Sequence, residues 1–172
     1  MSLIFDAMLP ADIPAIAAIE ARQHLTPWQA SSFEDALRCN WHACVLRDDD
    51  QNPTAIAGYF VTMSVGDDEE LLTITVAPDY IGQGHGRRLL DRWMQDSRAR
   101  GVQRLFLEVR ASNGSARRLY ESVGFTIVGM RKNYYPVPAD LAKAETKTMN
   151  QGQIAGREDA VLMQFAFQEA RE

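Results

Sequence analysis

The stretch "YIGQGHGRRLLDRW", Tyr80–Trp93, places glycine at three alternate positions, Gly82, Gly84 and Gly86, directly before an apolar helical pattern. Glycine loses more backbone freedom on folding than alanine, a cost of roughly 0.5–1 kcal/mol for each residue. A bare backbone must therefore serve a purpose there, and free amide groups at a helix N-terminus bind phosphate well. We predict that residues 82–87 form an anion-binding loop, and the alternative from the glycines alone is a flexible turn.

Two common phosphate-binding motifs can be tested by spacing. A dinucleotide fingerprint needs a third glycine at the position of Arg87 and an acidic residue near Gly101–Arg104, and neither is present. A Walker loop needs Lys-Ser/Thr where Arg87 and Arg88 stand. The spacing therefore excludes both motifs, and the two arginines add to the positive charge of about +0.5 at a helix N-terminus.

Length and composition predict one folded domain over residues 1–172, since 46% of the residues are apolar and 24% are charged. The net charge of −5 argues against a nucleic-acid partner. We see no membrane-spanning run and no secretion signal, so we expect a cytoplasmic protein without a membrane partner. Cys39 and Cys44 have no second cluster beside them, so we expect reduced thiols rather than zinc ligands or a disulfide.

Hydrophobic periodicity predicts the element order β-α-α-β-β-β-α-β-α-β-β, a mixed sheet with helices on its faces. In "ELLTITVAP" the alternation places Leu72, Ile74 and Val76 on one side and Thr73 and Thr75 on the other. The expected strands are 3–7, a hairpin within 42–63, 70–78, 103–109, 124–131 and 157–167; the expected helices are 10–23, 31–38, 86–100 and 112–123. Residues 137–155 show little periodicity and are predicted to be an exposed insertion.

With its flanks, the glycine loop "VAPDYIGQGHGRRLL" resembles the acetyl-CoA-binding segment of the GCN5-related N-acetyltransferases (GNAT), except that Ile81 stands where that motif has Gln or Arg. The segments "TPW", "LFLEVRASNGSARRLYESVGF", "RKNYYP" and "GREDAVLM" resemble the RimI-type branch, which acetylates the N-terminal alanine of a small-subunit ribosomal protein. The resemblance spans Met8 to Met163 apart from the insertion. It implies the GNAT fold, an α/β arrangement with a mixed, mostly antiparallel twisted sheet flanked by helices on both faces.

The resemblance implies direct acetyl transfer from acetyl-CoA to a protein N-terminus, in a monomer that needs no metal. Two alternatives stay open: acetylation of a lysine side chain or a small amine, and a non-catalytic acyl-CoA-binding module.

Asn113 is also a good helix N-cap, and His85 is expected to face solvent. The residues expected to bind acetyl-CoA are Ile74, Thr75, Val76, Gly82, Gln83, Gly84, His85, Gly86, Arg87 and Asn113.

Two residues are candidates for acid–base catalysis. Glu108 shares a strand face with Phe106 and should be partly desolvated, a condition that suits a general base. The resemblance makes Glu108 the proton acceptor, through water, and Tyr120 the general acid that protonates the leaving thiolate. The alternatives are a solvated glutamate on the sheet surface and a packing aromatic.

Three aromatic residues could line the peptide entrance: Trp28, Tyr134 and Tyr135. We place them in loops, where an aromatic ring can equally serve as a lid over the core.

Overall fold

The computed structural model describes residues 3–48, 55–137 and 156–168, so the predicted insertion lies outside the described residues except for Val137. The predicted element order is confirmed. The elements are β1 (Leu3–Ala7), α1 (Ile13–Gln23), α2 (Ala30–Arg38), β2 (His42–Asp48), β3 (Ile56–Val65), β4 (Asp68–Val76), α3 (His85–Ala99), β5 (Arg104–Arg110), α4 (Gly114–Ser122), β6 (Thr126–Pro136) and β7 (Arg157–Ala166).

The strand order is β1-β2-β3-β4-β5-β7-β6. The chain forms two compact units, residues 1–105 with 166–172 and residues 106–165, and each is described by itself. The prediction of a single domain stays a prediction. Among the described residues, no helix is both long enough and apolar enough to span a membrane.

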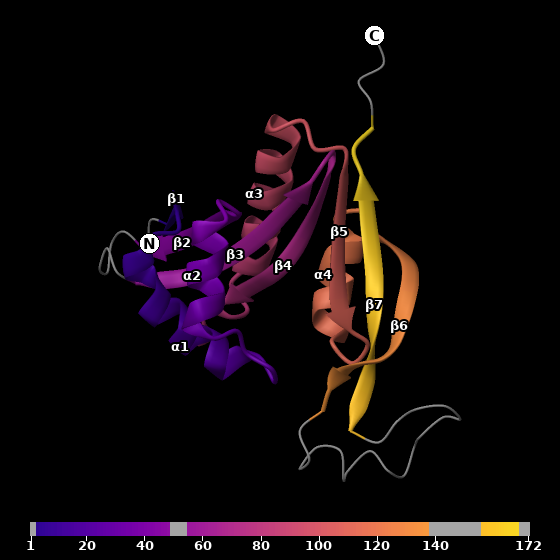
Figure 1. The fold of residues 1–172 in the computed structure, drawn as a ribbon, viewed down its shortest axis with the longest axis horizontal. Coiled ribbons are helices and arrows are strands. Elements are labelled where there is room, and N and C mark those ends of the chain that lie inside the picture. The colour runs from indigo at the N-terminus through magenta and orange to yellow at the C-terminus, as the bar shows by residue number, and fades with distance from the viewer. Residues whose placement is uncertain (1–2, 49–54, 138–155, 169–172) are drawn as a thin grey trace. The chain divides into compact units, whose positions relative to one another are not determined.

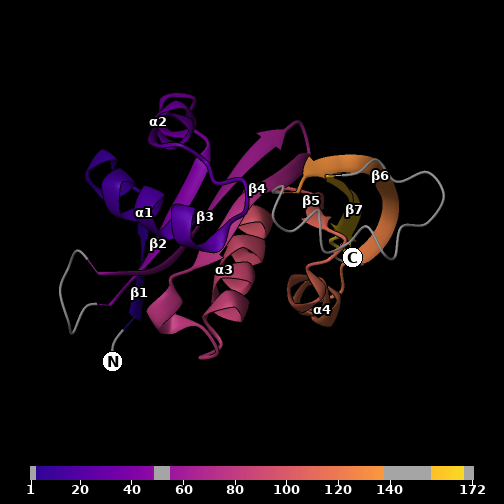
Figure 2. The same ribbon diagram turned by 90° about the horizontal axis from the view of Figure 1, so that it is seen from below.

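In the first unit, strands β1 to β4 pair antiparallel in chain order. Helices α1 and α2 cover one face of these strands, and α3 covers the other (Figures 1 and 2). The core under α1 and α2 is apolar because one stripe of each helix meets the alternating residues of β2 and β3. Its buried members are Met8, Ile13, Ile16, Phe33, Ala36, Ala43, Val45, Ile56, Tyr59 and Val61.

A β-bulge in β4 corrects the predicted alternation. Val61 of β3 pairs with Thr73, whereas the next residue, Thr62, pairs with Leu71, so Leu72 is an extra residue. An extra residue disrupts the alternation of faces locally. Leu72 therefore packs against the core under α1 and α2, and it does not continue the side formed by Ile74 and Val76.

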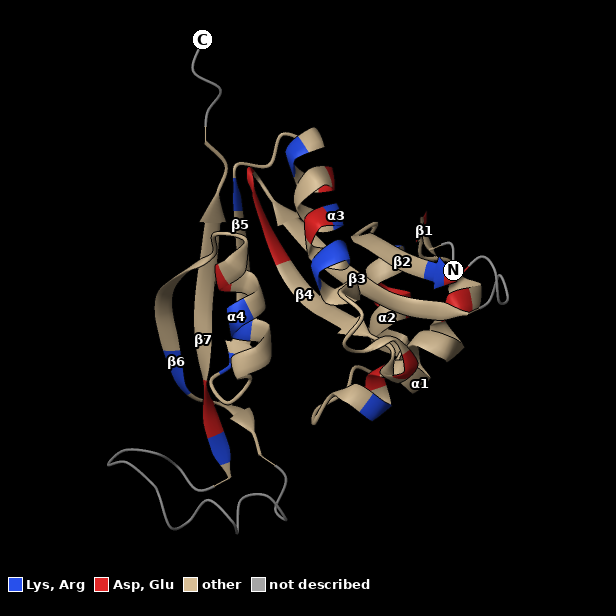
Figure 3. Ribbon diagram, turned by 180° about the vertical axis from the view of Figure 1, so that it is seen from behind, with Lys and Arg blue, Asp and Glu red and all other residues tan. Residues whose placement is uncertain are grey.

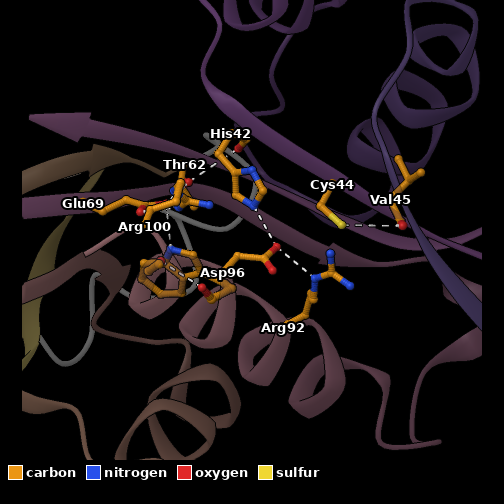
Figure 4. A network of polar contacts seen from close by, with 10 residues as sticks. His42, Cys44, Val45, Thr62, Glu69, Arg92, Asp96 and Arg100 are labelled. Carbon is orange, nitrogen blue, oxygen red and sulfur yellow. Dashed lines mark hydrogen bonds and ion pairs between the residues drawn. The ribbon is translucent and has the colours of Figure 1, made fainter. Parts of the chain in front are cut away.

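Helix α3 is joined to the strands beneath it by two polar clusters (Figure 4). In one, the buried Glu69 carboxylate binds the Arg100 guanidinium at 2.5 Å and accepts from the Trp93 indole at 3.1 Å. In the other, Asp96 binds His42 at 3.0 Å and Arg92 at 2.9 Å. Charged residues of both signs also lie along α3 (Figure 3).

The second unit contains β5, β6, β7 and α4. β6 and β7 pair antiparallel, with β6 reaching Pro136, so the aromatic residues of "NYYP" lie on a strand and not in the predicted loop. The β6–β7 register shifts between Arg131 and Tyr135, where Arg131 pairs with Ala160 and Tyr135 with Glu158. This irregularity is a bulge in the edge strand, a device that redirects side chains.

Candidate active site

Two of the three glycines in the loop adopt a backbone conformation that favours glycine. Gly82 and Gly84 have φ angles of 78° and 81°, in the left-handed region that favours glycine. A Cβ atom built on either residue would meet nothing within 4 Å. The amide groups of Gly82, Gln83 and Gly84 donate to no other described residue. These groups and the free amides of the first turn of α3 therefore provide unblocked donors that fit an anion.

The two arginines after the loop already have partners. The Arg87 Nε atom lies 2.8 Å from Asp91 Oδ1, one helical turn further along α3. The Arg88 Nη2 atom donates to the Leu3 carbonyl at 3.3 Å. The Arg87 pair is solvent-exposed and such pairs are weak, so Arg87 can turn toward a bound anion at small cost.

His85 was expected to face solvent, and that expectation is wrong. Its side chain is buried, with 4% of the residue exposed. Its ring contacts the Tyr80 ring at a centroid distance of 6.0 Å. Neither ring nitrogen has a hydrogen-bond partner among the described residues. Burial, with a smaller contribution from Arg88, lowers the pKa of His85.

The end of β4 is bound to α1. The Gln23 side chain donates to the Val76 carbonyl at 3.0 Å, so this carbonyl already has a partner. The His24 Nε2 atom lies 2.8 Å from the Thr75 hydroxyl, which in turn lies 3.3 Å from the buried Glu20 carboxylate. The expected acetyl-CoA-binding residues Ile74, Thr75 and Val76 are therefore held in place from the side of α1.

Glu108 has the placement that alternation in β5 predicts. Leu105, Leu107 and Val109 are buried on one side, whereas Glu108 is half-buried on the other with 15% of its side chain exposed. Its carboxylate lies 3.0 Å from the Arg131 guanidinium. The sequence did not predict this ion pair, because the two residues lie on different strands.

Tyr120 and Asn113 lie on and just before α4. Tyr120 is 6% exposed, and burial raises the pKa of its hydroxyl above the usual range, with a smaller contribution from Tyr135. The phenol is therefore protonated at neutral pH. The Asn113 side chain accepts a hydrogen bond from the Ala116 amide at 3.1 Å, which confirms its predicted N-cap position.

The three aromatic candidates fall in different units. Trp28 belongs to the first unit, where it is half-buried, packs on Phe33 at 5.3 Å and donates its backbone amide to Glu20. Tyr134 and Tyr135 belong to the second unit and contact each other edge to face at 5.0 Å. The packing of Trp28 is that of a lid over the core, and its place at a peptide entrance stays a prediction.

Sequence reasoning missed two features, a buried polar cluster and a single arginine. One is the group around Glu20, a charged residue that is 2% exposed and binds the hydroxyls of Tyr59, Thr73 and Thr75. The only sequence signal for it is a glutamate on the apolar stripe of α1. The other is Arg131, for which the sequence held no signal. Cys39 is exposed and Cys44 is buried, and both are free thiols.

In the first unit, the strand, glycine loop and helix leave amide groups open at a helix N-terminus, an arrangement typical of proteins that bind a phosphate-bearing ligand. Comparison with known proteins identifies the class. The model described as "Acetyltransferase (GNAT) family" matches residues 13–125, more than half of the chain. The chain therefore belongs to the GNAT family of acetyltransferases, and its cosubstrate is acetyl-CoA.

Individual relatives are similar along most of their length. The [ribosomal protein bS18]-alanine N-acetyltransferase of Escherichia coli is 38% identical over 152 residues, 88% of this chain and 89% of the relative. The enzyme of that name from Haemophilus influenzae is 36% identical and covers 88% and 90%. The crystal structure of the Escherichia coli ribosomal-protein-S18-alanine N-acetyltransferase superposes with a TM-score of 0.81 at 34% identity, over 99% of this chain and 97% of that one.

Proposed function

We propose that this acetyltransferase modifies the N-terminal alanine of a ribosomal protein, with the small-subunit protein bS18 as the first candidate. The observation that carries the proposal is a sequence identity of 38%, over 88% of this chain, to an enzyme that is named for that substrate. We also propose that the protein is cytoplasmic and works as a monomer without nucleic acid.

In the first unit, we propose that the loop of residues 82–87 holds the pyrophosphate of acetyl-CoA. The left-handed Gly82 and Gly84 leave the approach to the amide groups open. The positive end of α3 adds an electrostatic attraction that requires no side chain. Ile81, which is 58% exposed, can therefore replace the polar residue of the family motif without closing the loop.

In the second unit, we propose that Glu108 is the general base. The α-amino group of a peptide has a pKa near 8, so most of it is protonated at neutral pH and cannot act as a nucleophile. A half-buried carboxylate can take up that proton at one of its oxygens, directly or through one water molecule. Acetyl-CoA supplies the acetyl group as a thioester.

We propose that Tyr120 is the general acid. Its raised pKa ensures that the hydroxyl carries a proton at neutral pH, and this proton can pass to the departing sulfur. A raised pKa also makes the phenol a weaker acid, so the transfer depends on a short distance between hydroxyl and sulfur in the complex. Asn113, which precedes the same helix, is proposed to contact the pantetheine arm.

The assignment is tested by incubating the enzyme and acetyl-CoA with four substrates: an N-terminal bS18 peptide beginning with alanine, its N-blocked form, a lysine-containing peptide and a polyamine. Mass spectrometry should find one acetyl group on the free alanine amine and none on the blocked peptide. Modification confined to lysine side chains or to the polyamine would overturn the N-terminal assignment. Binding of acetyl-CoA without turnover on any amine would indicate a non-catalytic module.

A further inference from the structure

Arg131 contacts the proposed base without belonging to the predicted site. Its Nε atom lies 3.0 Å from Glu108 Oε1, with 53% of the Arg131 side chain exposed against 15% for Glu108. We propose that Arg131 is a positioning residue: it occupies and orients the Glu108 carboxylate in the free enzyme and is exchanged for the α-amino group of the substrate. This inference rests on the proposed function of Glu108.

The bulge in β6 places Arg131 beside Tyr134. Arg131 and Tyr134 are three residues apart, so in a regular strand their side chains would point to opposite faces. Asn133 has a φ of 53°, in the left-handed region that asparagine tolerates, and its amide donates to Asp159 Oδ1 at 2.8 Å. With the strand so distorted, the Arg131 guanidinium lies over the Tyr134 ring, 5.2 Å from its centroid.

A second pair of the same composition lies beside it and serves as an internal comparison. Arg110 binds Glu158 at 2.7 Å and lies over the Tyr135 ring, 4.5 Å from its centroid. Both charged side chains of this pair are largely buried, with 14% and 15% exposed. Arg110 also donates to the Pro136 carbonyl at 3.1 Å. This second pair is enclosed by its surroundings, and with the Pro136 contact it connects β5 to β6 and β7.

Arg131 differs from Arg110 in being open to water. An ion pair with a solvent-exposed partner is worth little, about 0.2–1 kcal/mol, because water replaces the lost contact. Tyr135 lies close enough to feel Glu108: burial first, and then Glu108, raise the pKa of Tyr135 to about 12. Arg110, which lies over the Tyr135 ring, is already paired with Glu158. Among the described residues, Arg131 is therefore the exposed cation paired with Glu108, and it can leave at small cost.

The exchange follows from charge. A substrate ammonium group carries the same charge as the guanidinium and needs the same carboxylate oxygens, so the two compete. The ion pair with Arg131 keeps the Glu108 carboxylate oriented before the substrate arrives. The competition makes the enzyme bind a charged N-terminus less tightly than it would if Glu108 were unpaired. Removing the Arg131 charge should therefore tighten binding of a free N-terminus and slow turnover.

The test measures peptide binding by calorimetry in the presence of CoA, which has no acetyl group to transfer. Two peptides are compared, one beginning with a free alanine amine and the same peptide N-acetylated. For R131Q we expect the dissociation constant of the free-amine peptide to fall by up to about five-fold, the change that corresponds to losing a competing exposed pair worth about 1 kcal/mol. The acetylated peptide should bind as it does to the wild type.

Lys132→Gln is the matched control, because it removes the same charge from the adjacent exposed residue. It should change neither affinity, and R131K, which keeps the charge, should stay closer to the wild type than R131Q. Equal effects of R131Q on both peptides, or no effect on either, would overturn the proposal. If R131Q proves unstable in thermal melting, R131M provides the same comparison with an apolar chain of similar reach.

The double variant E108Q/R131Q separates this inference from the proposed role of Glu108. If Arg131 acts through Glu108, R131Q should change neither peptide affinity nor turnover in the E108Q background. An additional effect there would overturn the inference. Full turnover by E108Q alone would instead remove Glu108 as the base, whatever the peptide affinities show.

Discussion

The hydroxyl of Tyr59 donates a hydrogen bond to the carboxylate of Glu20 inside the first unit, where the two residues are 0% and 2% exposed. The pair joins α1 to the middle of β3. Burial, followed by the nearby carboxylate, raises the pKa of Tyr59 above the usual range, so its hydroxyl stays a donor at all physiological pH values.

Tyr59→Phe should therefore destabilise the protein. The change leaves a buried carboxylate short of one donor, at a cost of about 1–3 kcal/mol. The hydroxyl of Thr75 and the amide of Trp28 still lie 3.3 and 3.2 Å from Glu20, which favours the lower part of this range. Urea unfolding measures the effect. Ser122→Ala, which removes an exposed helix hydroxyl, is the control, and an equal loss in both variants would contradict the prediction.

Gly84→Ala should weaken acetyl-CoA binding as well as stability. At a φ of 81° a side chain costs about 1–2 kcal/mol, and relaxation of that strain would turn the amide groups away from the anion. Calorimetry with acetyl-CoA on the folded variant measures the affinity.

Gly66→Ala is the control for this prediction. Gly66 has a φ of 61° in the turn between β3 and β4, and a Cβ built there also meets nothing within 4 Å. Its variant should lose similar stability with unchanged acetyl-CoA affinity. If Gly84→Ala binds acetyl-CoA normally, the loop does not hold the pyrophosphate.

Glu108→Gln should lower turnover by about 10²–10⁴, the usual contribution of a general base. Because the α-amino group can also lose its proton to solvent, with a pKa near 8, activity should partly recover as the pH rises. A pH–rate profile measures this recovery. A loss confined to the peptide KM would mark Glu108 as a binding carboxylate instead.

Tyr120→Phe should show the opposite pH behaviour. The variant lacks the proton donor, and a higher pH supplies no replacement acid, so its loss should persist on the alkaline side. Affinity for acetyl-CoA should stay near that of the wild type. Equal alkaline recovery in the Glu108 and Tyr120 variants, or losses of only a few-fold in both, would show that these roles are assigned wrongly.

His85→Leu should change how stability depends on pH. The folded-state pKa of His85 is lowered from 6.5 by burial, so below pH 6.5 the unfolded chain binds a proton that the folded chain resists. The wild type should therefore lose stability as the pH falls from about 6.5 toward the folded-state pKa. Above pH 6.5 this group contributes no slope.

Thermal melting between pH 5 and 8 compares the two proteins. The leucine variant should lose less stability on acidification. It should also be at least as stable at pH 7.5, because it no longer buries two ring nitrogens that find no partner in the described part of the chain. His42, whose pKa is also lowered mainly by burial, remains in both proteins and cancels in the difference. An unchanged pH dependence would contradict the account of His85.

Local chemistry in the sequence was sufficient for the element order, the position of the glycine loop and the Asn113 cap. Each depends on residues within a few positions of one another: apolar periodicity, the freedom of glycine at positive φ, and a side chain that reaches an amide three residues on. The same reasoning placed Glu108 on the opposite strand face from Leu105 and Leu107, because alternation is a property of a single strand.

Tertiary structure alone decided which partners these residues meet. The bulge at Leu72 depends on the register with β3, and the bulge before Tyr135 depends on the register with β7, so no spacing within one strand reveals them. His85 is buried by its surroundings in the folded chain, which include the Tyr80 ring. Arg131 meets Glu108 because strands distant in sequence bring their side chains together, and such contacts between distant residues are not encoded in any local pattern.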